Sequence, residues 1–333
     1  MKMKSSWAPA AAGLSLLCAA RAATITENFV HNPFQDGWQI FGDTNLFQWD
    51  SKNQVLDVTW DSSQPNSYFY HPLGTILGTN DDFSMSFDLV LTDYTVGGNA
   101  GFPSDFPVAT GLLNYSEATG SSFFRCGWPT QPDLAEFDFY QWDDLGDTNT
   151  VWPTFFDSAN DLFWDGDGSY GVVELPTNIL MHVVLNYTAA DETCELAITT
   201  NGVEVAAPVF ADLAEIGTNF GDYHLDTFAV ESYSQVNSEP PGSLLAHGTI
   251  GNIVLTVPPP PVTFLQVAPN SECWQVQFAS RMSWNYVLES SADLVTWSTN
   301  GPVVAGTGGN LILRDTNSLQ QQQFYRVNAL RAD

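Results

Sequence analysis

The sequence predicts an all-β protein: a two-sheet jelly-roll sandwich followed by a small β-sandwich domain. Three observations support this fold class. Apolar residues alternate with polar ones at a period of two, the dipeptide Asn201-Gly202 is a strong hairpin-turn signal, and helical periodicity is nearly absent. With 333 residues, of which 44% are hydrophobic and 13% aromatic, the chain is long enough to form two packed domains.

The N-terminal segment, residues 1–22, is typical of an export signal. Lys2 and Lys4 provide a basic start, residues 10–20 form an apolar run, and Ala20-Arg21-Ala22 is a small-x-small cleavage site. We therefore expect a secreted protein, released or held at the cell surface, that is cleaved near Ala22. No other stretch approaches membrane-spanning length, so we expect no membrane insertion.

A run of four prolines, residues 258–261, predicts a stiff linker between two domains, residues 23–257 and 262–333. The first domain contains clear strand patterns, at residues 56–60, 83–91, 136–141, 181–188, 194–200 and 243–257. Its best helical candidate is the short stretch 209–216. The second domain has strand patterns at residues 274–278, 286–289, 311–313 and 324–327.

The mature chain is strongly acidic, and the imbalance lies in the first domain. Removal of the signal leaves six basic residues against 38 acidic ones, a net formal charge of −32. Between residues 24 and 257 only Lys52 and Arg125 are basic, against 33 acids, whereas residues 258–333 carry four basic and five acidic residues. Such a surface repels nucleic acid and anionic lipid and leaves neutral or cationic partners and divalent metals.

Two carboxylates stand out in the stretch Glu136-Phe137-Asp138-Phe139-Tyr140-Gln141. Side chains alternate along a strand, so Glu136, Asp138 and Tyr140 should share one face and the two phenylalanines the other. Carboxylates two residues apart lie about 7 Å from each other and raise each other's pKa where water is partly excluded. The alternative is an ordinary acidic strand face on a very acidic protein.

Tryptophans flank this strand on both sides. Aromatic planes stack on the apolar faces of pyranose rings, while acids and amides bond the hydroxyl groups. We therefore expect sugar contacts from the aromatic, acidic and amide side chains of this region, namely Trp128, Glu136, Asp138, Tyr140, Gln141, Trp142, Trp152 and Trp164. The alternative is that the tryptophans simply fill the core.

With this acid strand, the first domain resembles the concanavalin A-like lectin/glucanase superfamily. The strand is similar to the E-x-D-x-x-E signature of the laminarinase-type glycoside hydrolases, family 16. That resemblance implies a jelly roll with the acids on its concave face, Glu136 as nucleophile and Asp138 as its helper. Gln141 stands where the family has its acid/base residue, and an amide cannot supply a proton to a leaving group.

Three functions follow from these expectations. The first is a secreted carbohydrate-binding or adhesion protein, whose partner is a polysaccharide or surface glycan. The second is a retaining endo-glycanase with a displaced general acid, in which Glu136 and Asp138 would be catalytic. The third is a structural envelope or matrix protein without a ligand. The oligomeric state is left open.

The second domain resembles immunoglobulin-like or fibronectin III-like modules at the C-termini of secreted bacterial proteins. The resemblance rests on the stretch 289–297, Glu-Ser-Ser-Ala-Asp-Leu-Val-Thr-Trp. It implies a role in adhesion, spacing or surface retention.

None of the three candidate functions requires a cofactor, but one segment could bind a metal ion. Asp161, Asp165 and Asp167 could supply oxygen ligands to a structural Ca²⁺, and the glycines at 166 and 168 allow a tight ligand loop. An acidic solvated loop is the alternative.

The mature chain keeps three cysteines, Cys126, Cys194 and Cys273. This odd number permits one disulfide, for which Cys126 with Cys194 is the first choice, or buried thiols throughout.

Overall fold

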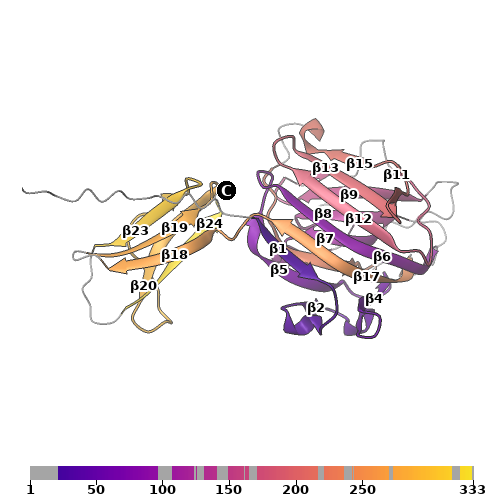
Figure 1. The fold of residues 1–333 in the computed structure, drawn as a ribbon, viewed down its shortest axis with the longest axis horizontal. Helices are drawn as coiled ribbons and strands as arrows, with labels where there is room; N and C mark the ends of the chain where they lie inside the picture. The colour runs from indigo at the N-terminus through magenta and orange to yellow at the C-terminus, as the bar shows by residue number, and fades with distance from the viewer. Residues whose placement is uncertain are drawn as a thin grey trace, which may run out of the picture. The chain divides into compact units, whose positions relative to one another are not determined.

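The computed structural model describes residues 22–96, 107–123, 125, 131–140, 149–160, 162–164, 171–216, 221–235, 242, 244–269, 273–316 and 323–331. The chain forms two compact units, Ala22–Pro260 and Pro261–Ala332. Both are built from antiparallel strands (Figure 1). The all-β fold class predicted from the sequence is confirmed: a sandwich of two large sheets precedes a smaller β unit.

The first unit contains two large antiparallel sheets, which we call sheet A and sheet B. Sheet A consists of β1 (Ala23–Glu27), β3 (Phe47–Asp50), β4 (Val55–Asp61), β6 (Phe83–Val96), β12 (Met181–Thr188), β13 (Thr193–Thr200), β14 (Val203–Glu204), β15 (Val209–Asp212) and β17 (Leu244–Val257). Its order is β14-β13-β12-β6-β17-β4-β3, with β1 paired to β17 and β15 paired to β13. The long strands β6 and β17 therefore lie at its centre.

Sheet B contains the acid strand as one of its interior strands. It consists of β2 (Gln39–Phe41), β5 (Ser67–Leu77), β7 (Val108–Leu113), β8 (Leu134–Tyr140), β9 (Thr150–Asp157), β10 (Leu162–Trp164), β11 (Gly171–Val172) and β16 (Leu225–Ser232). Its order is β10-β9-β8-β7-β16-β5-β2, and β11 pairs with β9. The acid strand β8 thus has a hydrogen-bonded neighbour on each side.

Helical segments are short in the part of the chain that the structure describes. They are α1 (Tyr115–Ala118) and the 3-10 turns η1 (Pro33–Gln35), η2 (Thr44–Leu46) and η3 (Leu213–Ile216). The helical expectation for residues 209–216 is wrong for its first half. There the chain forms β15, because Val209 and Ala211 are buried while alternate residues face outward, and the strand pairs with β13.

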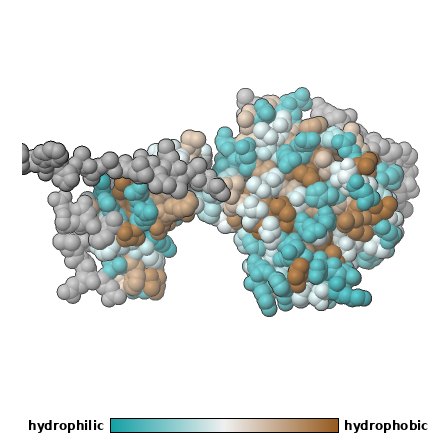
Figure 2. All heavy atoms as spheres, viewed as in Figure 1, coloured by the Kyte–Doolittle hydropathy of each residue, from teal (hydrophilic) through white to brown (hydrophobic). Residues whose placement is uncertain are grey.

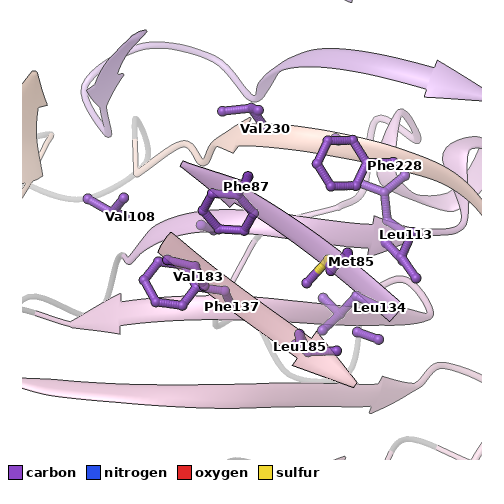
Figure 3. Close-up of a cluster of buried hydrophobic side chains, with 14 of the residues drawn as sticks. Met85, Phe87, Val108, Leu113, Leu134, Phe137, Val183, Leu185, Phe228 and Val230 are labelled. Atoms are coloured by element: carbon purple, nitrogen blue, oxygen red, sulfur yellow. The ribbon is translucent and has the colours of Figure 1, made fainter. Parts of the chain in front are cut away.

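The core lies between the two sheets. The alternating apolar residues of β6 are buried as predicted, and Phe87 packs edge-on against Phe137 of β8, with ring centroids 5.8 Å apart. Figure 3 shows Met85 and Phe87 from sheet A gathered with Phe137, Phe228 and other apolar side chains of sheet B. Phe139 likewise meets Tyr94 of β6 at 5.8 Å. The phenylalanines of β8 therefore point toward sheet A.

The hairpin predicted at Asn201-Gly202 connects β13 and β14. Asn201 has φ +49° and Gly202 has φ +74°, so both central residues adopt the left-handed conformation of a type I′ turn. Asparagine and glycine tolerate this conformation better than other residues, which is why the dipeptide marks the turn.

The second unit has two small sheets. Its strands are β18 (Val262–Pro269), β19 (Trp274–Ser280), β20 (Trp284–Ser291), β21 (Ser298–Thr299), β22 (Val304–Ala305), β23 (Asn310–Asp315) and β24 (Phe324–Arg331). One sheet has the order β18-β19-β23; the other has the order β21-β20-β22, with β24 paired to β20. Phe278 of β19 meets Tyr286 of β20, with ring centroids 5.0 Å apart, which joins the two sheets.

The surface of the first unit is mixed in the view of Figure 2, where polar residues surround smaller apolar patches. Within the described residues no helix is both long and apolar enough to cross a bilayer. Cys194 and Cys273 are buried free thiols, so Cys194 is not part of the expected disulfide. Its expected partner, Cys126, lies outside the described residues.

Candidate functional site

The candidate site lies on the side of sheet B that faces away from sheet A, which we call the outer face. Glu136, Asp138 and Tyr140 all point to this side, because the intervening phenylalanines occupy the core. All three also contact the same guanidinium group, that of Arg125. The alternation predicted for the acid strand is therefore observed.

Strand register aligns six residues in one row across the outer face. Paired residues in adjacent strands point to the same side of a sheet, and adjacent strands lie about 4.8 Å apart, so this row spans about 24 Å. From β2 to β9 the row reads Phe41, Tyr68, Glu231, Ala109, Asp138 and Trp152. Aromatic side chains thus stand at both ends of the row, and two carboxyl groups stand near its middle.

A second, parallel row passes through Glu136. It reads Gln39, Tyr70, Ala229, Gly111, Glu136 and Thr154. Gly111 is required at its place, because a Cβ atom there would lie 2.4 Å from both Cα and Cβ of Glu136. The absence of a side chain at Gly111 lets β7 and β8 approach each other directly beside this carboxyl group.

Arg125 binds the acids of both rows. Its Nε donates to Oε1 of Glu136 at 3.0 Å, and its Nη2 donates to Oδ2 of Asp138 at 2.7 Å. The same Nη2 lies 3.2 Å from the hydroxyl of Tyr140, and Nη1 donates to Oε1 of Gln131 at 2.9 Å. Arg125, Glu136 and Asp138 each have 0% exposed surface. The guanidinium group therefore makes its hydrogen bonds in the protein interior.

Two hydroxyl groups complete the shell around these carboxylates. Tyr233 donates to Oε2 of Glu136 at 2.5 Å, and Thr154 donates to Oδ2 of Asp138 at 2.6 Å. Tyr233 lies in the segment that follows β16, so this segment covers the carboxyl group of Glu136. We call Arg125, Glu136, Asp138, Thr154 and Tyr233 the arginine network.

A third carboxyl group, that of Glu231, lies next to the arginine network. Glu231 is fully buried, and neither of its oxygens has a hydrogen-bond partner among the described residues. Burial, reinforced by the charges of Glu136 and Asp138, raises the pKa of Glu231 well above its usual value. Burial and the neighbouring carboxylates therefore favour the protonated, neutral form of Glu231.

The same physical causes act on the acids of β8. Burial and the neighbouring charge of Asp138 raise the pKa of Glu136 to about 8, although Arg125 opposes the shift. Burial also raises the pKa of Asp138, again against the effect of Arg125. A single guanidinium among three buried carboxyl groups compensates one negative charge, which favours protonation of the others.

The burial of Glu136 and Asp138 differs from the expectation that these acids contact a sugar. Residues distant in sequence, Arg125 and Tyr233, cover both carboxyl groups and fill their hydrogen-bonding positions. A ligand lying on the outer face does not reach them in this structure. Sequence reasoning missed Arg125, Tyr233 and Glu231; the one available signal was that Arg125 is a rare cation among 33 acids.

Tyr140 and Trp152 form the accessible part of the site. Both are half-buried, and their ring centroids lie 5.9 Å apart with an interplanar angle of 58°. The arginine network fixes Tyr140 through its hydroxyl group, which also donates to Oδ2 of Asp138 at 3.4 Å. We call Tyr140 and Trp152 the aromatic pair.

A second aromatic group, which the sequence did not predict, stands at the opposite end of the rows. Phe41 stacks on Tyr68 with centroids 5.6 Å apart, and Tyr70 meets Tyr115 at 4.6 Å. The hydroxyl of Tyr115 donates to that of Tyr70, which donates to Gln39. Phe41 and Tyr115 are half-buried, so part of this group faces solvent.

Several predicted site residues fall outside the described residues: Trp128, Gln141, Trp142, Asp161, Asp165 and Asp167. Trp164 lies in β10, where the backbone alone is described. These sugar and Ca²⁺ contacts stay predictions. Among the described residues no group of three or more His, Cys, Asp or Glu side chains is arranged to hold a metal ion.

No protein-family model and no curated protein matches this chain. Among solved structures the chain is similar to basic winged bean lectin with Tn-antigen, at 10% identity over 71% of this chain and 98% of that one, with a TM-score of 0.48. It is also similar to lectin II from Ulex europaeus, at 13% identity over 72% of this chain and 100% of that one, with a TM-score of 0.45. A third similar structure is peanut lectin with a 9mer peptide, at 11% identity over 72% of this chain and 98% of that one, with a TM-score of 0.44.

Proposed function

We propose that residues 22–260 form a glycan-binding module of a secreted protein, which holds a sugar chain without cleaving it. The observation that carries this proposal is the half-buried aromatic pair, Tyr140 and Trp152, on the outer face of sheet B. Aromatic rings of this kind stack on the apolar faces of pyranose rings, and nearby hydroxyl and amide groups bond the sugar hydroxyls.

The arginine network supports binding by fixing the aromatic pair. Arg125 and Asp138 both bond the hydroxyl of Tyr140, and Asp138 is the cross-strand partner of Trp152. A ring already held in place loses less conformational freedom when a ligand binds. The buried acids therefore serve the site as its support, and the rings make the contact.

The same network argues against hydrolysis. A retaining glycosidase needs two carboxyl groups about 5 to 5.5 Å apart that reach the glycosidic bond from opposite sides. Glu136 and Asp138 have no exposed surface and are bound to Arg125. The raised pKa of Glu136 would suit a general acid, but a buried group cannot protonate a sugar that does not reach it.

Export and surface attachment belong to the same proposal. Residues 1–22 would direct secretion, and the small C-terminal unit would act in adhesion, spacing or surface retention. The partner would be a polysaccharide or a surface glycan. A structural Ca²⁺ at Asp161, Asp165 and Asp167 remains part of the proposal, to be tested by metal analysis of the purified protein.

Affinity electrophoresis of the mature chain in gels containing laminarin, agarose or hydroxyethylcellulose tests this function. We expect at least one polysaccharide to retard the protein, and we expect Tyr140→Ala and Trp152→Ala each to weaken retardation at least tenfold. Phe210→Ala is the matched control, because Phe210 is an exposed aromatic residue in sheet A.

Three outcomes would contradict the proposal. Unchanged retardation in both aromatic variants would remove the aromatic pair from the site. Release of reducing sugar by the wild-type protein, abolished in Glu136→Gln, would favour the hydrolase. Absence of both retardation and turnover across a broad glycan panel would favour a structural protein without a ligand.

A further inference from the structure

We infer that the glycan bound at this site is uncharged and that carboxylated or sulfated polysaccharides are excluded. This inference rests on the proposed function and adds the chemical class of the ligand. It follows from the placement of the two basic residues of the first unit, together with the distribution of its acids.

Arg125 cannot pair with an anionic sugar. Proteins recognise carboxylate and sulfate groups mainly through arginine and lysine, whose donors must face the ligand. The donors of Arg125 instead face Glu136, Asp138 and Gln131, and its side chain has no exposed surface. The guanidinium nearest the aromatic pair is thus unavailable to a ligand.

Lys52 cannot take its place. It lies in the turn between β3 and β4 of sheet A, whereas the aromatic pair belongs to sheet B. Its backbone amide donates to Asp50, which places a carboxylate beside it. No other lysine or arginine occurs between residues 22 and 260.

The acids of the first unit act on the site over long range. A compact unit of this length has a radius of gyration of about 18 Å. The Debye length is about 30 Å at 10 mM salt and about 3 Å at 1 M. At low salt the negative net charge of this unit, which has 33 acids against two basic residues, therefore repels an anionic polymer from the whole surface, including the outer face.

Neutral sugars meet no such barrier. The rings of Tyr140 and Trp152 offer apolar faces, and at the opposite end of the outer face the exposed Gln39 presents its amide beside the hydroxyl of Tyr70. These groups suit the hydroxyl and C–H surfaces of an uncharged pyranose. Amine-bearing polymers are attracted by the net charge alone, without use of the aromatic pair.

Matched polymer pairs test the inference. The mature protein is run in gels with agarose or κ-carrageenan, hydroxyethylcellulose or carboxymethylcellulose, and laminarin or its sulfated derivative, each at 10 mM and at 1 M NaCl. We expect retardation by the charged member to be at least tenfold weaker than by its neutral partner at 10 mM. We expect the difference to narrow at 1 M, where the charges are screened.

Two controls separate site binding from bulk charge. Lys52→Gln is expected to leave every retardation unchanged, because this residue lies away from the outer face. Chitosan is expected to bind wild type and Trp152→Ala equally at 10 mM and neither at 1 M, which is the behaviour of a bulk ionic contact.

The outcomes distinguish this inference from the function on which it rests. Equal or stronger retardation by a charged member at 10 mM, lost in Trp152→Ala, would overturn the inference while leaving glycan binding intact. If no neutral or charged polymer retarded the protein at either salt concentration, the proposed function itself would be rejected.

Discussion

Nη2 of Arg125 lies 2.7 Å from Oδ2 of Asp138, and neither side chain has any exposed surface. Through this contact, the pair of carboxylates that resembles a glycosidase signature belongs to a buried network. It also ties the segment containing Arg125 to β8 across the outer face of sheet B. The chemistry left to a ligand is therefore that of the rings and neutral polar groups beside the network.

Removal of Arg125 should destabilise the first unit strongly. Arg125→Met leaves Glu136 and Asp138 buried without their cation, which typically costs about 3–5 kcal/mol. Arg125→Lys keeps the charge but loses the fork of donors, so we expect an intermediate loss. Urea denaturation at pH 7 measures both.

Lys52→Met is the matched control for this prediction, because it removes an exposed charge from the same unit. We expect a change within about 0.5 kcal/mol for that variant. If Arg125→Met cost no more than Lys52→Met, the network would not be a support of the fold.

The two isosteric changes Glu231→Gln and Asp138→Asn should have opposite effects on stability. The Glu231 side chain has no described hydrogen bond, and burial raises its pKa, so a neutral amide of the same shape should leave the free energy of unfolding at pH 7 unchanged or raise it. Asp138 accepts bonds from Arg125 and Thr154, and the loss of its charge should cost about 1.5–3 kcal/mol. A loss above about 1 kcal/mol in Glu231→Gln would show that its carboxyl group has a partner.

Stability should fall as pH rises through the neutral range. The pKa of Glu136 is about 8 in the folded protein and 4.5 in its ordinary state, so between these pH values the folded unit binds more protons than the unfolded chain. The free energy of unfolding then decreases by up to about 1.4 kcal/mol per pH unit for each such proton, and levels off above pH 8.

Urea titrations at pH 5, 6.5, 8 and 9 measure this slope. Glu231 contributes in the same direction, because its pKa is also raised by burial, so Glu231→Gln should flatten the slope. A free energy of unfolding that increased between pH 5 and pH 8 would contradict the protonated network.

Two glycine substitutions should differ in their cost. In Gly111→Ala the new Cβ would lie 2.4 Å from backbone and side-chain atoms of Glu136, so β7 and β8 would have to separate, at about 3 kcal/mol or more. Gly202→Ala meets no atom within 4 Å, and its cost of about 1–2 kcal/mol comes from φ +74° alone. Thermal denaturation of both variants checks the order, and equal costs would mean that the close approach at Gly111 is relaxed in solution.

The sequence predicted the fold class and which side chains of the acid strand share a face, because strand alternation is a local signal. Residues 83–91 and the turn at Asn201-Gly202 follow the same logic and are observed as predicted. The burial of the acids was not predictable in this way. Arg125 is 11 residues from Glu136 in the chain, and Tyr233 is 97 residues from it.

Glu231 illustrates the same limit. Its strand, β16, is not among the strands named from the sequence, and its carboxyl group meets the others only because β7 brings β16 and β8 together. A polar residue in an alternating strand looks the same whether it faces water or a buried network. The tertiary pairing of three strands, which no local pattern contains, decides between the two.

Glycan binding by the aromatic pair is tested most directly by affinity electrophoresis of wild type, Tyr140→Phe and Trp152→Ala in the best-retaining neutral polysaccharide, with reducing-sugar release measured on the same samples. We expect retardation of wild type, partly weakened retardation of Tyr140→Phe because its ring remains but the hydroxyl held by Arg125 and Asp138 is lost, at least tenfold weaker retardation of Trp152→Ala, and no sugar release. Undiminished retardation of Trp152→Ala, or sugar release that depends on Glu136, would contradict this expectation.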